Sequence, residues 1–385
     1  MIPPYIKLLI ASTIAASTVA AAPPPTPTPS PTQSQGIAGD LAIPTDGPAK
    51  SAKPAQESDS LPTLGGDFAD PFVLRANGTY YAFATNAGGK NIHAARSTDL
   101  KTWSDVDDPL PALPSWAQAN EGLTWAPTVL KRDNGFVLYY TARDKASGLQ
   151  CIGRATSTAP EGPYVDDSTE PFICQVTAPQ ALCGSIDPSP FVDDNGDPYL
   201  VWKSDENAAP CHGNSRLWSQ KLTSDGRSLA GTPTPLLQRD RAWEAPLIEG
   251  PSMVKAAGKY YLFYSANWWE SANYAIGYAE CQGPLGPCEK RTTDRPLVAS
   301  SSGALGPGGQ EFVTDEKGQL WMAYHAWSQP TVGYANGGAR SLHMTPVSFE
   351  NGIPTFGVPT ANSPSPAVDV ATSKESQPAK SKSNG

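Results

Sequence analysis

Three of the chain's acidic residues, each one or two positions before a proline, lie at widely separated points. Asp70 and Asp187 directly precede a proline, and Glu249 lies two residues before one. Taken singly, an Asp-Pro step is usually only a turn signal. If the fold brings the three carboxyl groups together, they offer an acid that donates a proton and a base that activates water. Cleavage of a glycosidic bond requires such a pair.

The residues around these carboxylates belong to a repeat. Short apolar runs, each followed by a turn signal and an aromatic run, recur at intervals of roughly 60 residues, and a fixed period of that size indicates an array of similar units. The five units begin at Asp70-Pro71, Ala126-Pro127, Asp187-Pro188, Gly250-Pro251 and Gly308-Gly309. Relative to its proline, Glu249 therefore stands one residue earlier than the two aspartates. We expect a β-bulge or the backbone flexibility of Gly250 to turn the Glu249 side chain to the same face.

Each unit has the pattern of a β-hairpin followed by further strands. Runs such as 80–83, 136–140 and 199–202 are aromatic and β-branched, which predicts strands. Radial repetition of four-stranded sheets around a channel protects the sheet edges. The sequence therefore predicts an all-β, five-bladed β-propeller with a central active-site channel, in which equivalent positions of different blades converge. An irregular β-sandwich is the alternative, and it would not need a repeated starting motif.

Composition changes sharply along the 385 residues. Residues 1–22 combine one lysine with a short apolar run and small residues, which predicts a signal peptide rather than a membrane span. Residues 23–60 are rich in Pro, Ser and Thr and predict a disordered linker. We expect one folded domain over 61–359, a disordered tail over 360–385, and a secreted, extracellular protein that does not bind membranes.

Cysteine usage and charge narrow the function further. The six cysteines form an even set without a C-x-x-C pair, so disulfides are expected. A tight turn predicts a Cys281–Cys288 bond, and the pairing of the other four stays open. With a net charge of −9, a pI of about 5.0 and no basic block, the chain lacks the footprint of nucleic-acid binding. We expect a monomer that acts on a neutral substrate and carries a glycosylation sequon at Asn77-Gly78-Thr79.

Four motifs of the repeat resemble those of glycoside hydrolase family 43, in that family's order and spacing. They are Ala69-Asp70-Pro71-Phe72, Thr124-Trp125-Ala126-Pro127, Ser185-Ile186-Asp187-Pro188-Ser189-Pro190-Phe191 and Ile248-Glu249-Gly250-Pro251-Ser252. The resemblance implies a five-bladed propeller and an inverting mechanism. It makes Asp70 the general base, Glu249 the general acid, and Asp187 the residue that orients Glu249 and raises its pKa. Inversion places the base and acid carboxyls roughly 6.5–9.5 Å apart.

The resemblance also points to two residues of the fifth unit. Arg340 resembles an arginine that reaches the substrate sugar, against the alternative of a surface ion pair. His325 resembles a histidine that helps hold a hydrated calcium ion in the family's arabinanases, so Ca²⁺ in the channel is a candidate cofactor, and none other is implied. Against this, a lone histidine at a strand end is more often a satisfied core group. The stretch 306–310 departs from the Gly-His-Asn type of sequence common there.

Further candidates follow from residue type alone. Trp125 and Phe72 are candidate sugar-binding residues, with Trp243 and Trp268 as weaker ones, because aromatic faces suit sugar rings as well as protein cores. Glu244 and Glu121 are retained as weaker candidates for the acid. The resemblance to family 43 implies a plant cell-wall polysaccharide or oligosaccharide as the substrate, with release of α-L-arabinofuranosyl residues from arabinan or arabinoxylan as the leading activity. The alternatives are β-xylosidase, endo-1,5-α-L-arabinanase and, in another class, a non-catalytic sugar-binding propeller.

Overall fold

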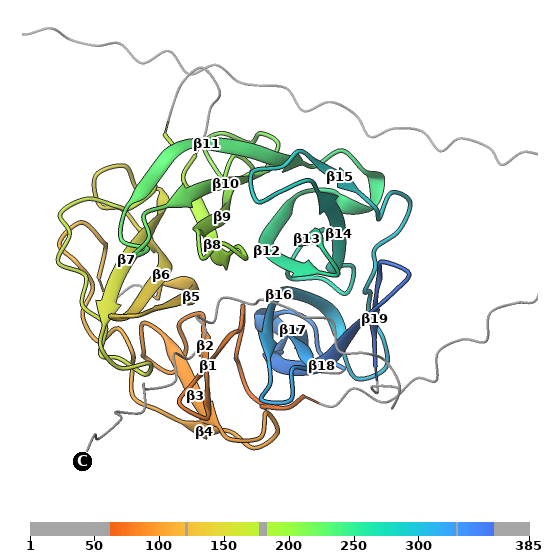
Figure 1. Cartoon of the computed structure of the whole chain (residues 1–385), viewed down its shortest axis with the longest axis horizontal. Helices are drawn as coiled ribbons and strands as arrows, with labels where there is room; N and C mark the ends of the chain where they lie inside the picture. Colours follow the sequence, from red (N-terminus) through yellow and green to blue (C-terminus); the bar gives the residue numbers. More distant parts are fainter. Residues whose placement is uncertain (1–61, 120–121, 177–182, 329, 358–385) are drawn as a thin grey trace, which may run out of the picture. The chain divides into compact units, whose positions relative to one another are not determined.

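Five antiparallel sheets stand around a common axis in the computed structural model, which describes residues 62–119, 122–176, 183–328 and 330–357 (Figure 1). Successive strands of each sheet run from the axis outward, with β1, β5, β8, β12 and β16 innermost. The predicted five-bladed β-propeller is therefore confirmed.

The strands group by blade. Blade one contains β1 (Phe72–Ala76), β2 (Thr79–Ala84), β3 (His93–Ser97) and β4 (Ser104–Asp105). Blade two contains β5 (Trp125–Arg132), β6 (Gly135–Arg143) and β7 (Gln150–Ser157). Blade three contains β8 (Ser185–Val192), β9 (Pro198–Ser204), β10 (Arg216–Leu222) and β11 (Leu229–Gln238). Blade four contains β12 (Ile248–Ala256), β13 (Lys259–Ala266), β14 (Ala275–Cys281) and β15 (Cys288–Lys290). Blade five contains β16 (Leu305–Thr314), β17 (Leu320–Trp327), β18 (Arg340–Glu350) and β19 (Ile353–Phe356). Two 3₁₀ turns, η1 (Ala242–Glu244) and η2 (Tyr334–Asn336), lie in connections.

The hydrophobic core is divided into five clusters, one between each pair of neighbouring blades. Strand β1 shows how the sequence builds them. Phe72 and Leu74 pack into the cluster shared with blade two, whereas Val73 packs into the cluster shared with blade five. Because successive side chains of a strand point to opposite faces, a blade covered on both faces needs nearly continuous apolar runs, which is the pattern found in the sequence.

A residue with left-handed backbone conformation marks the start of every blade. The φ angles are 50° at Asp70, 44° at Ala126, 56° at Asp187, 54° at Gly250 and 60° at Gly309. In blades two to five the pairing register of the innermost strand shifts at this point, as it does at a β-bulge. The residue equivalent to the two aspartates is therefore Gly250 in blade four, with Glu249 directly before it.

The fifth blade starts one residue later than we expected. Both Gly306 and Gly309 are left-handed, and Gly309 lies at the register shift between Gly308 and Glu311 that matches the other blades, so the equivalent pair is Gly309-Gln310 rather than Gly308-Gly309. A side chain at Gly309 would meet Nδ1 of His325 at 2.7 Å and Oδ1 of Asp70 at 3.0 Å. Glycine is thus required here both by the backbone conformation and by the close approach of blade one.

The ring is closed by backbone hydrogen bonds between the segment before β1 and strand β18. The amide of Thr63 donates to the carbonyl of Leu342 at 2.8 Å, and the amide of Phe68 donates to the carbonyl of Arg340 at 2.7 Å. Residues from opposite ends of the folded region therefore join blade one to blade five.

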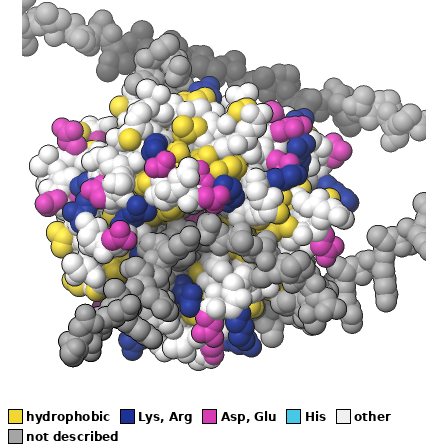
Figure 2. Space-filling model, viewed as in Figure 1, with side chains coloured by type: hydrophobic (Ala, Val, Ile, Leu, Met, Phe, Trp, Pro, Cys, Tyr) yellow, Lys and Arg dark blue, Asp and Glu magenta, His cyan; other side chains and the backbone are white. Residues whose placement is uncertain are grey.

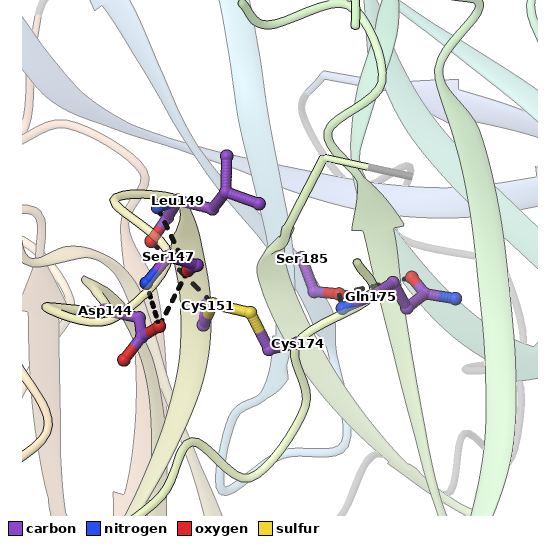
Figure 3. The surroundings of a disulfide bond; sticks show 7 residues. All are labelled: Asp144, Ser147, Leu149, Cys151, Cys174, Gln175 and Ser185. Carbon is purple, nitrogen blue, oxygen red and sulfur yellow. Dashed lines mark hydrogen bonds between the residues drawn. A yellow bond between two sulfur atoms is a disulfide. The ribbon is translucent and has the colours of Figure 1, made fainter. Parts of the chain in front are cut away.

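Three disulfides tie the connections together. Cys281–Cys288 links β14 to β15, as predicted. Cys151–Cys174 links β7 to the segment that leads toward blade three, and Cys183–Cys211 links the start of that blade to a loop beyond β9. Figure 3 shows Gln175, next to Cys174, facing Ser185 of β8, whose hydroxyl donates to the Gln175 side-chain oxygen at 3.2 Å. The Cys151–Cys174 disulfide and this hydrogen bond anchor β8 at Ser185, which lies two residues before Asp187.

The surface view shows acidic and basic side chains interspersed on the described part of one face (Figure 2). The sequon residue Asn77 lies exposed between β1 and β2. Among the described residues, no helix has the length and apolar character needed to cross a membrane. The expected signal peptide, linker, C-terminal tail and Glu121 lie outside the described residues.

Candidate active site

A cavity of about 570 Å³ opens at the centre of the ring, lined by residues of all five blades. Asp70 and Asp187 reach it from the left-handed starts of blades one and three, and Glu249 reaches it from the first strand of blade four. The structure therefore brings together the three carboxylates that the repeat singled out.

Asp70 is held as a carboxylate by groups from three directions. The Thr85 hydroxyl donates to its Oδ2 at 2.6 Å, and Nη1 of Arg340 lies 3.5 Å from its Oδ1. Burial opposes ionisation, but the Arg340 charge and the Thr85 hydrogen bond outweigh it and lower the pKa of Asp70. The Asp70 amide donates to Nδ1 of His325 at 3.0 Å. An ionised carboxylate at the cavity wall is suited to accept a proton from water.

Arg340 is fixed in an aromatic cage. Its guanidinium lies 4.7 Å from the ring centre of Trp269, 5.5 Å from that of Tyr334 and 6.0 Å from that of Trp327. Its Nε also donates to the Tyr334 hydroxyl at 3.0 Å. Arg340 therefore does not form a surface ion pair. It lines the cavity, is only 8% exposed, and places its positive charge next to Asp70.

Asp187 has the opposite electrostatic environment. Burial and the nearby charges of Glu249 and Asp70 raise the pKa of Asp187, and Lys203 opposes this only in part. Its Oδ2 accepts a hydrogen bond from the amide of Gly250 at 2.9 Å. Because that amide follows Glu249 in the chain, Asp187 positions Glu249 through the backbone, and it supplies a carboxyl group that retains a proton beside it.

Both oxygens of Glu249 are held by donors. The Tyr274 hydroxyl donates to Oε1 at 2.8 Å, and the Lys203 ammonium donates to Oε2 at 3.0 Å. Burial raises the pKa of Tyr274, so its hydroxyl remains a donor. Its ring stacks on His325 at 5.9 Å between centres. The Glu249 side chain thus has one fixed position at the cavity wall.

The remaining predicted residues divide into two groups. Trp125 and Trp268 line the cavity, and Trp268 is 45% exposed. Phe72 does not: it is 6% exposed and packs in the core between blades one and two, which corrects its expected place at the site. Trp243 packs on Tyr264 outside the cavity.

Glu244 also lies away from the cavity. It is fully buried, lies 2.7 Å from the Lys290 ammonium and accepts a hydrogen bond from Tyr264 at 2.9 Å. This buried network gives Glu244 a structural role within blade four, away from the carboxylates of the cavity.

The surroundings of His325 do not fit a calcium site built by protein ligands. His325 is fully buried behind the cavity wall, and burial lowers its pKa to about 3, so the imidazole is neutral and its Nδ1 is occupied by the Asp70 amide. Only Nε2 lacks a hydrogen-bond partner. Calcium prefers six to eight oxygen ligands, and no cluster of three or more His, Cys, Asp or Glu suited to a metal is found among the described residues.

Several residues of the site were not predicted from the sequence, among them Thr85, Lys203 and Tyr274. Thr85 and Tyr274 lie next to ordinary strands and carry no distinctive signal. Lys203 had one, because it is the only charged residue in the otherwise apolar run 199–203 of the blade that carries Asp187. Lysine is rarely buried unless it is paired.

Comparison with known proteins agrees with the fold and the site. The profile of the glycosyl hydrolases family 43 matches residues 60–354. The "Extracellular exo-alpha-(1->5)-L-arabinofuranosidase" of Streptomyces avermitilis is 26% identical over 85% of this chain and 69% of its own length. The "Probable arabinan endo-1,5-alpha-L-arabinosidase A" of Aspergillus flavus is 27% identical over 74% of this chain and 89% of its own.

A solved structure shares the architecture. The structure described as "Crystal structure of a thermostable family-43 glycoside hydrolase" superimposes with a TM-score of 0.69 at 30% identity, covering 80% of this chain and 99% of that one. The chain belongs to glycoside hydrolase family 43. It is therefore a glycosyl hydrolase, which sets aside the non-catalytic alternative.

Proposed function

We propose that this protein is a secreted, inverting hydrolase that releases α-L-arabinofuranosyl residues from arabinan or arabinoxylan. The observation that carries the proposal is the pairing, in one cavity, of an ionised Asp70 with an Asp187 that retains a proton beside Glu249. Two acidic sites whose environments push their pKa values apart provide a base and an acid at the same pH.

In the proposed reaction each group has one task. Asp70 accepts a proton from a water molecule as that water attacks the anomeric carbon. Glu249 donates a proton to the glycosidic oxygen as the bond to the leaving group breaks. Asp187 holds the backbone next to Glu249 through the Gly250 amide and keeps a proton available to the pair. Solvent exchange then returns a proton to Glu249 and removes one from Asp70.

The cavity suits a neutral sugar. Its volume of about 570 Å³ lies within the roughly 300–1,000 Å³ common for small-ligand sites. Trp125 and Trp268 offer aromatic surfaces at its wall, on which a sugar ring can stack. Arg340 lines the cavity beside Asp70, and in this proposal it donates to a hydroxyl group of the bound sugar.

Secretion is supported by three disulfides within the described residues, because such bonds persist in oxidising compartments. One relative is also named as extracellular. The N-terminal signal peptide and glycosylation at Asn77 are part of the same proposal.

The test compares three substrates: an aryl α-L-arabinofuranoside, an aryl β-xyloside and linear arabinan. We expect arabinose release from the first to exceed xylose release from the second. Xylose as the main product would indicate a β-xylosidase, and arabinan oligomers would indicate an endo-arabinanase. NMR of the first-formed sugar anomer reports inversion or retention.

Two variants test the catalytic roles. Glu249→Gln and Asp70→Asn should each lower kcat by about 10²–10⁴-fold, since each removes a proton-transfer partner. A good aryl leaving group should restore activity to Glu249→Gln but not to Asp70→Asn, because a good leaving group needs no protonation. Glu244→Gln is the matched control. Full activity in Glu249→Gln, together with loss of activity in a folded Glu244→Gln, would move the acid role to Glu244.

A further inference from the structure

Lys203 is an ammonium group buried at the catalytic pair. Its side chain is 1% exposed, and its Nζ lies 2.9 Å from Oδ1 of Asp205 and 3.0 Å from Oε2 of Glu249. Burial disfavours its charged form, but the charges of Glu249, Asp205 and Asp187 together raise the pKa of Lys203. The group is therefore a permanent cation at the cavity wall. Burying it carries a desolvation cost that good pairing must repay.

The cavity contains few cations, so the charge of Lys203 has a large effect on the protonation of the nearby carboxyl groups. Among the described lining residues only Arg340 and Lys203 are cations, and Arg340 is committed to Asp70. The titratable and charged groups around the Asp187–Glu249 pair are Lys203, Asp205, Asp70, Tyr274, Arg340 and Glu311. Lys203 is the cation in contact with the pair itself, so its charge opposes the tendency of two crowded carboxyls to take up protons.

The position of Lys203 also restricts the geometry of Glu249. With Tyr274 on Oε1 and Lys203 on Oε2, the carboxyl plane is fixed from two sides. The two donors come from different blades: Lys203 lies on β9 of blade three, and Tyr274 directly precedes β14 of blade four. Lys203 thus joins the blade that carries Asp187 to the blade that carries Glu249.

We propose that Lys203 is a positioning residue that holds Glu249 in place and limits the proton uptake of the Asp187–Glu249 pair, and thereby sets the alkaline limit of catalysis. The proposal rests on the function proposed above. It assigns no contact between Lys203 and the reacting atoms.

The experiment is the pH dependence of kcat/KM for an aryl α-L-arabinofuranoside in Lys203→Met, Lys203→Arg and Asp205→Asn. Without the ammonium the pair keeps its proton to higher pH, so the alkaline limb of Lys203→Met should move up by about 1–3 pH units. Asp205→Asn leaves the ammonium with Glu249 as its one acidic partner, so the limb should move down. Lys203→Arg should stay near the wild-type position. At the optimum, kcat of Lys203→Met should fall about tenfold to a hundredfold because Glu249 loses an anchor.

Lys290→Met is the matched control. Lys290 is also buried and paired with two carboxylates, Asp240 and Glu244, but it does not line the cavity. The alkaline limb of the kcat/KM profile of Lys290→Met should coincide with that of the wild type. Limbs that coincide in Lys203→Met and wild type, or that move in the same direction in Lys203→Met and Asp205→Asn, would overturn the proposal.

A measurement without substrate separates this proposal from the proposed function. Side-chain ¹³C NMR of labelled aspartate and glutamate follows the protonation of the pair in wild type and Lys203→Met. A wild type inactive on arabinofuranosides with a titration shifted upward in Lys203→Met would refute the proposed function and leave standing the effect of Lys203 on the protonation of the pair. An active wild type without an upward shift in Lys203→Met would support the proposed function and refute the role of Lys203.

Discussion

The hydroxyl of Thr85 gives the most direct test of how the site keeps Asp70 ionised. Thr85 donates to Asp70 at 2.6 Å and accepts a hydrogen bond from the Ala126 amide at 3.1 Å. Thr85→Val keeps the shape of the side chain and removes both bonds. A hydrogen bond to a charged group contributes about 1.5–3 kcal/mol, and one pKa unit corresponds to about 1.4 kcal/mol. The loss should therefore raise the pKa of Asp70 by about 1–2 units.

The direction of the effect on activity follows from the role of the base. Asp70 must be ionised to accept a proton, so activity is present above its pKa and lost below it. Raising that pKa moves the acidic limb of the kcat/KM profile to higher pH by the same amount. The profile is measured with an aryl arabinofuranoside, and urea unfolding should show a loss of about 1–3 kcal/mol from the unpaired Ala126 amide.

Thr85→Ser is the control, because it keeps the hydroxyl and loses only a methyl group. Its acidic limb should remain at the wild-type position. If the limb of Thr85→Val also stays there while the protein loses stability, Thr85 supports the fold alone, and the assignment of Asp70 as a base tuned by its neighbours is refuted.

Three further predictions concern residues outside the reacting pair. Burial raises the pKa of Glu311 from 4.5 to about 8, so the folded protein holds a proton that the unfolded chain has lost, and stability should fall as pH rises through that interval. Asp187, whose pKa is also raised by burial, contributes to the same slope, so Glu311→Gln should reduce the slope and stabilise the protein by about 1–3 kcal/mol at pH 8, measured by urea unfolding at pH 5 and pH 8. A slope as steep in the variant as in the wild type would contradict the prediction. Phe72→Ala should cost about 3–5 kcal/mol of stability with little change in KM, and a large rise in KM in a folded variant would return Phe72 to the site. A chelator should leave kcat unchanged, and a loss that calcium reverses would reinstate a metal near His325.

The blades could be predicted from the sequence because each of them repeats the same local sequence pattern. A left-handed start, an apolar strand and a tight turn recur with one period, and three of the five starts carry a carboxylate in or next to the left-handed position. The start of blade five was misplaced by one residue because Gly306, Gly308 and Gly309 are three glycines within four residues. Local sequence does not show which of them adopts the left-handed conformation.

What the sequence could not supply were the partners brought in from other blades. Phe72 stands two residues after Asp70 and was expected beside it, but the left-handed conformation of Asp70 interrupts the strand alternation, and the Phe72 ring packs in the core between blades one and two. Lys203 contacts Glu249 across 46 positions of sequence. Four cysteines allow three pairings, and only the arrangement of the loops decides for Cys151–Cys174 and Cys183–Cys211.

The segment before β1 closes the ring by pairing with the fifth blade, so the geometry around Asp70 depends on that blade. Asp70 lies in the first blade, but Arg340 and His325, which hold its side chain and amide, belong to the last. A nascent polypeptide that has emerged only as far as blade four contains all three carboxylates and still lacks the cation that keeps the base ionised. We therefore expect hydrolytic competence only once the fifth blade has been synthesised and has docked against the first.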